Sequence, residues 1–259
     1  MNFRMRRLRA ALPWLLVAVL SSGTVMLVLL PAAWIMPQFA KATSGHVNLV
    51  DPAGSLWQGS ATLMLAAGSD TSAATLLPGR IEWHTAFWPL FTGRVRMTML
   101  QSEAMPDPVT VDATRRGATL SQGTIAVPAS LLTGLGAPFN TLDLQGNVRL
   151  AWSEWRSFGK EAFGQLTVTL TDASSRVSLV KPLGSYQVVI QAEGNHSTIA
   201  LSTLKGPLML NGRGAVSAGS SMFNGTASAA PEARDNLAGL LNLLGRPSGP
   251  DTVALSFVR

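Results

Sequence analysis

The chain contains no cysteine, one tyrosine, three histidines and few charged residues among its 259 positions. The absence of cysteine excludes a disulfide framework, a thiolate nucleophile and a cysteine-ligated metal. It is also compatible with an oxidising compartment, where an unpaired thiol is a liability. Only 13% of the residues are charged, whereas 47% are hydrophobic. Chemistry that needs clusters of titratable side chains therefore has little material here, while a chain of this length can bury a substantial core.

Basic residues outnumber acidic ones, 20 to 14, but the excess is concentrated at the N-terminus. Arg4, Arg6, Arg7 and Arg9 fall within the first nine residues, and no acidic residue accompanies them. The remaining 16 basic and 14 acidic residues leave a net charge of only +2. A nearly neutral body offers no electrostatic footprint for phosphates, and the sequence carries no motif of a DNA or RNA reader. Nucleic acid is therefore excluded as a partner.

An uncharged stretch follows the arginines and continues until Lys41. Its apolar core is about 20 residues long, which suffices for a helix to span the ~30 Å hydrocarbon layer. We expect a transmembrane helix over residues 10–34, with Trp14 and Trp34 at the two interfaces. Because the arginines precede this helix, they predict a cytoplasmic arm at residues 1–9.

A cleaved signal peptide is the alternative for this segment, with "AKA" at residues 40–42 as its cleavage site. The apolar run is longer than a secretory one, so we favour the membrane anchor. Pro31 and Pro37 then end the helix, and residues 35–44 form a short tether. Under either interpretation, residues 45–259 lie outside the cytoplasm as a periplasmic β-rich domain.

Beyond the tether, apolar and polar residues alternate with a period of two. In "WQGSATLML" one face carries Trp57, Gly59, Ala61, Leu63 and Leu65. The same alternation occurs in residues 93–100, 141–152, 164–172, 185–192 and 252–258. It predicts strands with one buried face and one wet face. Gly- and Asn-rich turn signals at short intervals favour antiparallel pairing over βαβ units, and "NG" at Asn224 and Gly225 predicts a hairpin turn.

Two segments break the alternation. "PASLLTGLG", from Pro128, predicts one or two helical turns, and "PEARDNLAGLLNLLG", from Pro231 to Gly245, predicts a helix. The leucines of the second segment form one stripe that should pack on the sheet: Leu237, Leu240, Leu241 and Leu244. Each insert ends in Gly-x-Pro, which leaves two similar β-halves as an alternative to one undivided domain. The predicted fold is mainly β, with a single N-terminal transmembrane helix before a large antiparallel twisted sheet.

Candidates for catalysis are few. His84 lies two residues from Glu82 on one strand face, and we expect this pair to be a solvated one beside a buried Trp83. His46 and His196 have no ligand partner nearby, and no spacing typical of a zinc site occurs. Nucleophile-elbow and phosphate-binding loop motifs are also missing. We therefore expect no enzyme, no metal and no cofactor.

The tryptophans beyond the anchor offer a further choice between core and ligand platform: Trp57, Trp83, Trp88, Trp152 and Trp155. Most of them fall on or near the apolar face of a predicted strand. Core filling is therefore the favoured interpretation, and a sugar-binding platform is the alternative.

Several segments in a fixed order carry a likeness to a known family: "GSLWQGSATL", "LPGRIEW", "LDLQGNVRLAW", "PLGSYQVVIQAEG", "LSTLKGPLMLNGRG", "FNGTASAAPE" and "LAGLLNLLG". In this order they resemble the type II secretion system protein N family, also called general secretion pathway protein N, over about residues 45–257. The signature residues are Gly54, Leu56, Trp57, Gly59, Pro78, Gly79, Trp83, Gly206, Pro207 and Gly225. Trp57 is expected to anchor the first exported strand between its flanking glycines.

The resemblance implies a bitopic inner-membrane protein of a Gram-negative cell, with a short cytoplasmic arm and a large periplasmic domain. It implies a non-catalytic, accessory role in the export of folded proteins across the outer membrane. Partners would be other inner-membrane components of the type II secretion system, with outer-membrane components as further candidates. No small-molecule substrate is expected. Two other functions stay open: an envelope lipid-handling protein with an apolar β-groove, and a periplasmic glycan-binding module.

Overall fold

The computed structural model describes residues 21, 29–34, 36–68, 70–136, 139–217, 220–249 and 251–258. The basic arm, with its four arginines, and most of the expected transmembrane helix lie outside the described residues. Among the residues that are described, no helix is long and apolar enough to cross a membrane.

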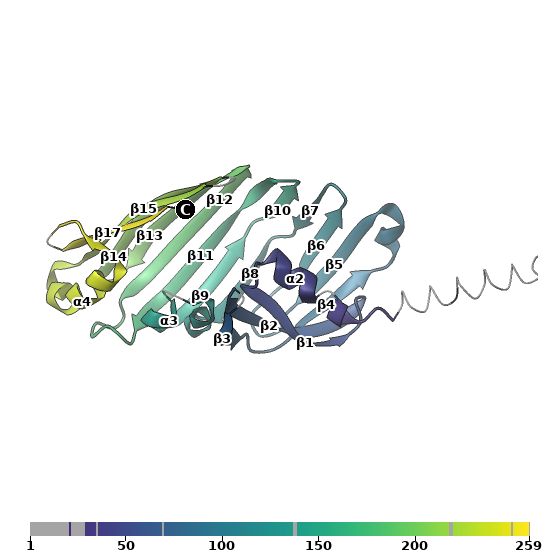
Figure 1. The fold of residues 1–259 in the computed structure, drawn as a ribbon, viewed down its shortest axis with the longest axis horizontal. Helices are drawn as coiled ribbons and strands as arrows, with labels where there is room; N and C mark the ends of the chain where they lie inside the picture. Colours follow the sequence, from purple (N-terminus) through teal and green to yellow (C-terminus); the bar gives the residue numbers. More distant parts are fainter. Residues whose placement is uncertain are drawn as a thin grey trace, which may run out of the picture.

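The described strands join one antiparallel sheet of 17 strands (Figure 1). The strands of its N-terminal part are β1 (Val47–Gly54), β2 (Gln58–Ala67), β3 (Asp70–Leu76), β4 (Ile81–Ala86), β5 (Arg94–Leu100), β6 (Val109–Thr114), β7 (Gly117–Leu120) and β8 (Gly123–Pro128). Those of its C-terminal part are β9 (Leu144–Trp152), β10 (Trp155–Phe158), β11 (Glu161–Ser175), β12 (Gly184–Gly194), β13 (His196–Lys205), β14 (Leu208–Ser217), β15 (Ser220–Ala229), β16 (Arg246–Pro247) and β17 (Thr252–Val258). The large antiparallel sheet predicted from the alternation is confirmed.

The helices are short. They are the 3-10 helices η1 (Ala32–Trp34), η2 (Trp88–Thr92), η3 (Ala129–Leu135) and η4 (Pro231–Ala233), and the α-helices α2 (Met36–Ala42), α3 (Phe139–Leu142) and α4 (Arg234–Leu244). The helical turns predicted after Pro128 are η3, and the helix predicted after Pro231 is η4 continued by α4. In the range assigned to the tether, the chain forms α2.

Sequential strands are neighbours through most of the sheet. Two long strands are each interrupted, at the same level: β7 and β8 are the two parts of one, and β9 and β10 are the two parts of the other. β7 pairs with β10, and β8 pairs with β9, in one continuous register: Leu120 lies opposite Trp155, and Gly123 lies opposite Trp152. β11 spans this interruption, because its first residues pair with β10 and its later residues pair with β9. From β11 onward, β12, β13, β14, β15 and β17 follow side by side.

One face of the sheet is apolar across many strands. Directly paired residues share a face in antiparallel strands, and the rows on this face are Leu150, Val168, Val188 and Leu201, then Trp152, Leu166, Ile190 and Ile199. On β15 the residues of the other face, Met222, Asn224 and Thr226, are exposed. The two-faced strands predicted from sequence are therefore confirmed.

The apolar face is covered by short helices rather than by a second sheet. Over the C-terminal strands, α4 packs on β15 and β17, with Leu237, Leu240 and Leu241 buried and Leu244 half-buried. Figure 1 shows α3 and α4 at the same ends of these strands. Over the N-terminal strands, Met36 of α2 packs against a cluster of Ala32, Ala61 and Trp83. The leucine stripe predicted on α4 is confirmed.

The hairpin turn predicted at Asn224 and Gly225 is wrong, because both residues lie in the middle of β15. Gly225 pairs with Gly212 of β14, and a Cβ atom at either glycine would collide with neighbouring atoms, including the ring of Phe223. These glycines therefore provide room for an aromatic ring lying on the sheet, not a change of chain direction.

Candidate functional site

An apolar cavity of about 670 Å³ lies between the sheet and the helices at the C-terminal end of the domain. Six strands and three helical segments contribute most of its wall. The lining residues are Leu132, Phe139, Leu142, Leu144, Val148, Leu150, Val168, Leu170, Ala173, Ser175, Leu183, Tyr186, Val188, Leu201, Leu208, Leu210, Phe223, Leu240 and Leu244. This volume falls within the range of about 300–1,000 Å³ typical of small-molecule sites.

The segments over the cavity are held in place by hydrogen bonds to the sheet. The hydroxyl of Thr75 on β3 donates to the carbonyl oxygen of Leu131 in η3 at 2.6 Å. On the opposite side, the backbone N–H of Ala230, which precedes η4, donates to the carbonyl oxygen of Pro207 at 2.7 Å. The cover is therefore held at one side by β3 and at the other by the turn between β13 and β14.

Only two lining residues carry a polar side chain, and both polar groups are already used within the protein. The Ser175 hydroxyl donates to the carbonyl oxygen of Leu142, and the Tyr186 hydroxyl donates to the carbonyl oxygen of Leu208 at 3.0 Å. Burial raises the pKa of the Tyr186 phenol, because the phenolate would lose its hydration there. The cavity therefore offers apolar contact and no polar group free to orient a ligand.

Charged residues near this end of the sheet are paired with each other. Lys205 contacts Asp172 at 2.8 Å, and Arg176 contacts Asp143 at 2.8 Å. Asp172 and Arg176 flank lining positions of β11, but their own side chains are largely exposed. No charged side chain of the described residues lines the cavity, so nothing in its wall selects for a charged ligand.

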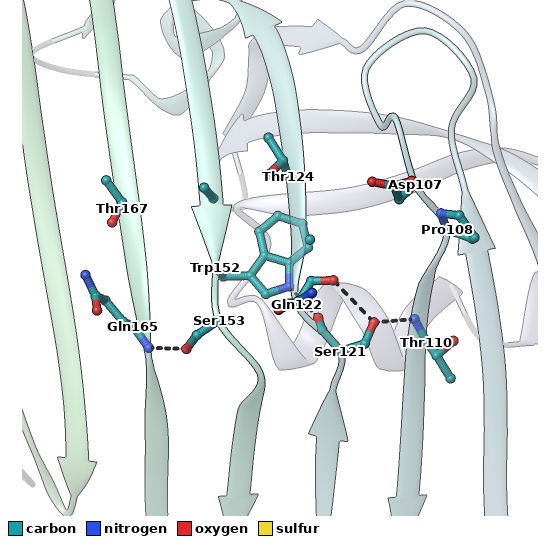
Figure 2. A pocket seen from close by; sticks show the side chains of 12 residues that line it. Asp107, Pro108, Thr110, Ser121, Gln122, Thr124, Trp152, Ser153, Gln165 and Thr167 are labelled. Atoms are coloured by element: carbon teal, nitrogen blue, oxygen red, sulfur yellow. Dashed lines mark hydrogen bonds between the residues drawn. The ribbon is translucent and has the colours of Figure 1, made fainter.

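A second hollow, of about 720 Å³, lies at the interruptions between β7 and β8 and between β9 and β10 (Figure 2). Its walls carry hydroxyl and amide groups, and the Trp152 indole lies among them with its N–H donating to the carbonyl oxygen of Ser121 at 2.8 Å. The Ser121 hydroxyl accepts from the N–H of Thr110 at 2.9 Å, and the Ser153 hydroxyl accepts from the N–H of Gln165 at 3.0 Å. These hydroxyls replace the strand pairing lost at the interruption, so the hollow has a structural explanation.

One histidine, His84, lines a smaller hollow of about 510 Å³ together with Glu82, beside Gly59 and Trp83. His84 and Glu82 are both exposed on β4, on either side of buried Trp83, as the sequence predicted. His46 Nδ1 accepts a hydrogen bond from the N–H of Gly68 at 3.1 Å, and His196 lies 3.8 Å from Glu193 at the surface. Within the described part of the chain, no three His, Cys, Asp or Glu side chains gather as metal ligands.

The stretch "GSLWQG" around Trp57 forms a tight entry to β2, so the expectation that it opens the first strand is wrong, because β1 precedes it. The buried ring at this entry belongs to Trp83 of another strand. Trp83 of β4 lies over Gly59, where a Cβ atom would collide with it, and its indole N–H donates to the carbonyl oxygen of Ser55 at 3.2 Å. Gly54 has a φ of +82°, which suits glycine at this turn. Trp57 itself makes an edge-on contact with Phe87, with ring centroids 5.6 Å apart.

The other signature residues mark turns and close backbone approaches. Gly79 has a φ of +77°, and the carbonyl oxygen of Pro78 accepts from the Gln101 side chain at 2.7 Å. Gly206, with a φ of +122°, lies against the backbone of Gly184, and Pro207 precedes the cavity wall. The structure therefore brings Gly54, Leu56, Trp57, Gly59 and Trp83 together, and it places Gly206, Pro207 and Gly225 elsewhere.

Sequence reasoning missed an exposed aromatic group. Trp88 is 80% exposed, so the core role expected for it is wrong, and Phe87 and Phe91 are exposed beside it. The physical reason is that Trp88 begins η2, the short connection between β4 and β5, in which no residue is buried. The signal was present in "FWPLF", where three aromatic residues fall within five positions without the alternation of a strand.

The fold and the cavity define a class of protein: a single large antiparallel sheet whose apolar face is covered by short helices. Comparison with protein families then gives its membership. The sequence model of type II secretion system protein N matches residues 45–256, and this chain belongs to that family. No curated protein and no solved structure matches the chain.

Proposed function

We propose that this chain is a non-catalytic, accessory component of the type II secretion system that helps to export folded proteins from the periplasm across the outer membrane. The observation that carries this proposal is the family match, which covers nearly the whole β-sheet domain. The lack of a catalytic constellation among the described residues is compatible with an assembly role. Other components of the secretion apparatus are the expected partners.

The proposed topology places residues 1–9 in the cytoplasm, the apolar run from residue 10 to about residue 30 across the inner membrane and the β domain in the periplasm. The expected end of the span at residue 34 is wrong, because Pro31 pairs with Ser55 and Ala32 is buried in the β domain. It is supported by the cluster of arginines before a long uncharged apolar run. Such an anchor would hold the sheet near the inner-membrane components of the apparatus.

The mechanism we propose is partner capture by strand addition at a free sheet edge. β17 pairs with β15 along seven residues, but β16 covers it only at Val253 and Ala254. Among the described residues, no strand pairs with Leu255 and Ser256 on the side of β17 that faces away from β15. Unpaired N–H and C=O groups at such an edge are a template for another strand.

Deletion of the gene tests the secretion role. Known type II exoproteins should accumulate in the periplasm and be missing from the medium, and the intact gene should restore their release. Unchanged release, together with altered membrane permeability or lipid composition, would reject the secretion role.

A photo-crosslinking amino acid at Ser256 tests strand addition in living cells. Thr198 of β13 is the matched control, because it is also exposed on the outer face but lies three strands away. A crosslink to a secretion component from Ser256 and none from Thr198 is the expected result. Equal crosslinking at both positions would place the contact on the face of the sheet instead of its edge.

A second function, handling of envelope lipids, is supported by the apolar cavity. Each methylene group that leaves water for such a site gains about 0.8 kcal/mol. A single acyl chain matches a cavity whose polar groups are all used internally, whereas a sugar or a peptide would leave its own polar groups unpaired.

A photoreactive fatty acid carrying a diazirine on its chain tests this second function on the full chain in lipid nanodiscs. Labelling should map by mass spectrometry to cavity-lining peptides. Val188→Trp fills the cavity from its wall, whereas Val189→Trp places the same ring on the opposite face of β12. Loss of cavity labelling in the first variant alone supports lipid handling, and labelling that ignores both substitutions rejects it.

A further inference from the structure

Four aromatic residues gather at the β4–β5 connection, and we name them the aromatic tip: Trp57, Phe87, Trp88 and Phe91. Phe87 is the centre of the group, with ring centroids 5.6 Å from Trp57, 6.2 Å from Trp88 and 5.4 Å from Phe91. Trp88 is 80% exposed and Phe91 is 72% exposed. A contiguous exposed apolar group of this kind marks an interaction surface.

The tip is a built feature of the fold. It is held by η2, which has a proline in its first turn and ends at Gly93 with a φ of +71°. The N–H of Gly93 donates to the carbonyl oxygen of Leu90 at 2.9 Å, which closes the turn. Val95, which follows on the apolar face of β5, is also exposed. The exposed apolar surface thus continues from η2 onto the start of β5.

Hydrogen bonds join the tip to the end of the apolar N-terminal run. The N–H of Leu56 donates to the carbonyl oxygen of Leu30 at 2.9 Å, and Leu30 is the last residue of that run before Pro31. The Thr85 hydroxyl donates to the carbonyl oxygen of Leu56 at 2.8 Å, two residues before Phe87. The chain therefore leaves the domain toward the apolar run immediately beside the aromatic tip.

The chemistry of the tip fits a lipid interface better than a sugar. Three of its four ring contacts are edge-on, so the rings form a wedge and not a flat platform. Residues 85–96 contain no acidic residue, and Arg94 is exposed directly after Gly93. Tryptophan beside apolar rings and a nearby arginine are typical of segments that lie in the boundary between headgroups and acyl chains of an anionic membrane.

We propose that the aromatic tip inserts into the periplasmic surface of the same membrane that holds the N-terminal run, as a second point of attachment. With two attachments the domain is fixed in one orientation on the bilayer, whereas a single anchor would let it rotate. The inference rests on the proposed membrane anchor, and the experiment below separates the two.

The absence of cysteine makes single labelling sites available in the full chain. Phe91→Cys and Trp88→Cys each carry a fluorophore at the tip, and both positions are exposed enough to tolerate replacement. Val19→Cys reports on the apolar run. Leu179→Cys, in the β11–β12 loop, is the control, because Leu179 is an equally apolar position that is 87% exposed.

The labelled chains are reconstituted into vesicles of phosphatidylethanolamine and phosphatidylglycerol, with and without nitroxide-bearing lipid as the quencher. Tip labels should be quenched at least about twofold more than the Leu179→Cys label, as expected for side chains at the headgroup–acyl boundary. Quenching at Val19→Cys without quenching at the tip overturns the second attachment and leaves the anchor intact. Loss of quenching at Val19→Cys rejects the anchor separately.

Two other results would also overturn the proposal. Equal quenching at the tip and at Leu179→Cys would mean that the whole domain adsorbs to lipid without using the tip. A tip label that ignores nitroxide lipid but changes its emission on addition of soluble peptidoglycan fragments would assign the tip to glycans.

Discussion

The hydroxyl of Tyr186 on β12 donates a hydrogen bond to the carbonyl oxygen of Leu208 on β14 at 3.0 Å, inside the wall of the apolar cavity. β13 lies between these two strands, so the bond spans a neighbouring strand at the end where the sheet meets Leu183 and Gly206. It is one of the hydrogen bonds that join the wall of the apolar cavity to the turn that contains Pro207.

Tyr186→Phe should lower the free energy of unfolding by about 1 kcal/mol, because the carbonyl of Leu208 loses its donor. The folded protein keeps the Tyr186 proton to a higher pH than the unfolded chain, whose phenol has a pKa of about 10. The contribution of Tyr186 to the free energy of unfolding is therefore fully present below pH ~10 and declines as the pH rises above that value. Urea unfolding at neutral and alkaline pH measures both effects. A wild-type alkaline decline equal to that of the variant would contradict this assignment.

Gly212→Ala should destabilise the domain by about 1–3 kcal/mol, because the added Cβ atom overlaps the ring of Phe223. Combining it with Phe223→Leu should cost less than the sum of the two single changes, since the smaller side chain removes the overlap. Gly239→Ala on α4 is the control: outside the adjoining backbone of its own helix, no atom lies within 4 Å of its added Cβ, and a gain of up to about 1 kcal/mol is expected there. Additive losses in the double variant would argue against the ring contact.

Leu237→Ala should cost about 2–5 kcal/mol of unfolding free energy, because Leu237 is 0% exposed in the core under α4. Leu243→Ala, on the same helix but 63% exposed, should change it by less than about 0.5 kcal/mol. Thermal unfolding of the two variants compares them within one helix. Similar losses at both positions would mean that α4 packs on the sheet by another face.

Arg80→Lys should destabilise the start of the domain by about 1 kcal/mol, a small value because Asp51 is largely exposed. The Arg80 guanidinium donates to the Asp51 carboxylate at 2.5 Å, to the Asp51 carbonyl oxygen at 2.6 Å and to the Ser60 hydroxyl at 3.0 Å. A lysine ammonium cannot reproduce this planar set. Hydrogen exchange of β1 amides measures the loss, and Arg156→Lys, whose contact with Glu154 is 3.6 Å, should leave them unchanged.

Much of the sheet could be predicted from local pattern. Alternation identified β2, β5, β9, β11, β12 and β17, and the leucine stripe of α4 predicted the face that it buries. The "NG" pair at Asn224 and Gly225 misled because glycine serves two purposes: it permits turns, and it leaves room for a neighbouring ring. Which purpose applies depends on Gly212 and Phe223, and Gly212 lies on a different strand.

The candidate sites were the least predictable part. Trp88 and Trp83 are five positions apart and belong to the same short region, yet one is exposed and the other is buried. Their difference arises from what packs on them: Gly59 leaves room for the Trp83 ring, whereas Trp88 begins η2, a connection without buried residues. Side chains that line the apolar cavity come from residues 132 to 244, so no local window of sequence contains the site.

The sequence by itself determined the two-faced strands, the apolar N-terminal run, the helix after Pro231 and the likeness to the secretion family, because each rests on the order of neighbouring residues. Only the tertiary structure decided where the apolar face is left uncovered. The cavity under α3 and α4 and the aromatic tip beside Leu30 arise from contacts between distant segments. Such contacts depend on how strands align across the whole sheet, and a periodic pattern alone carries no information about that alignment.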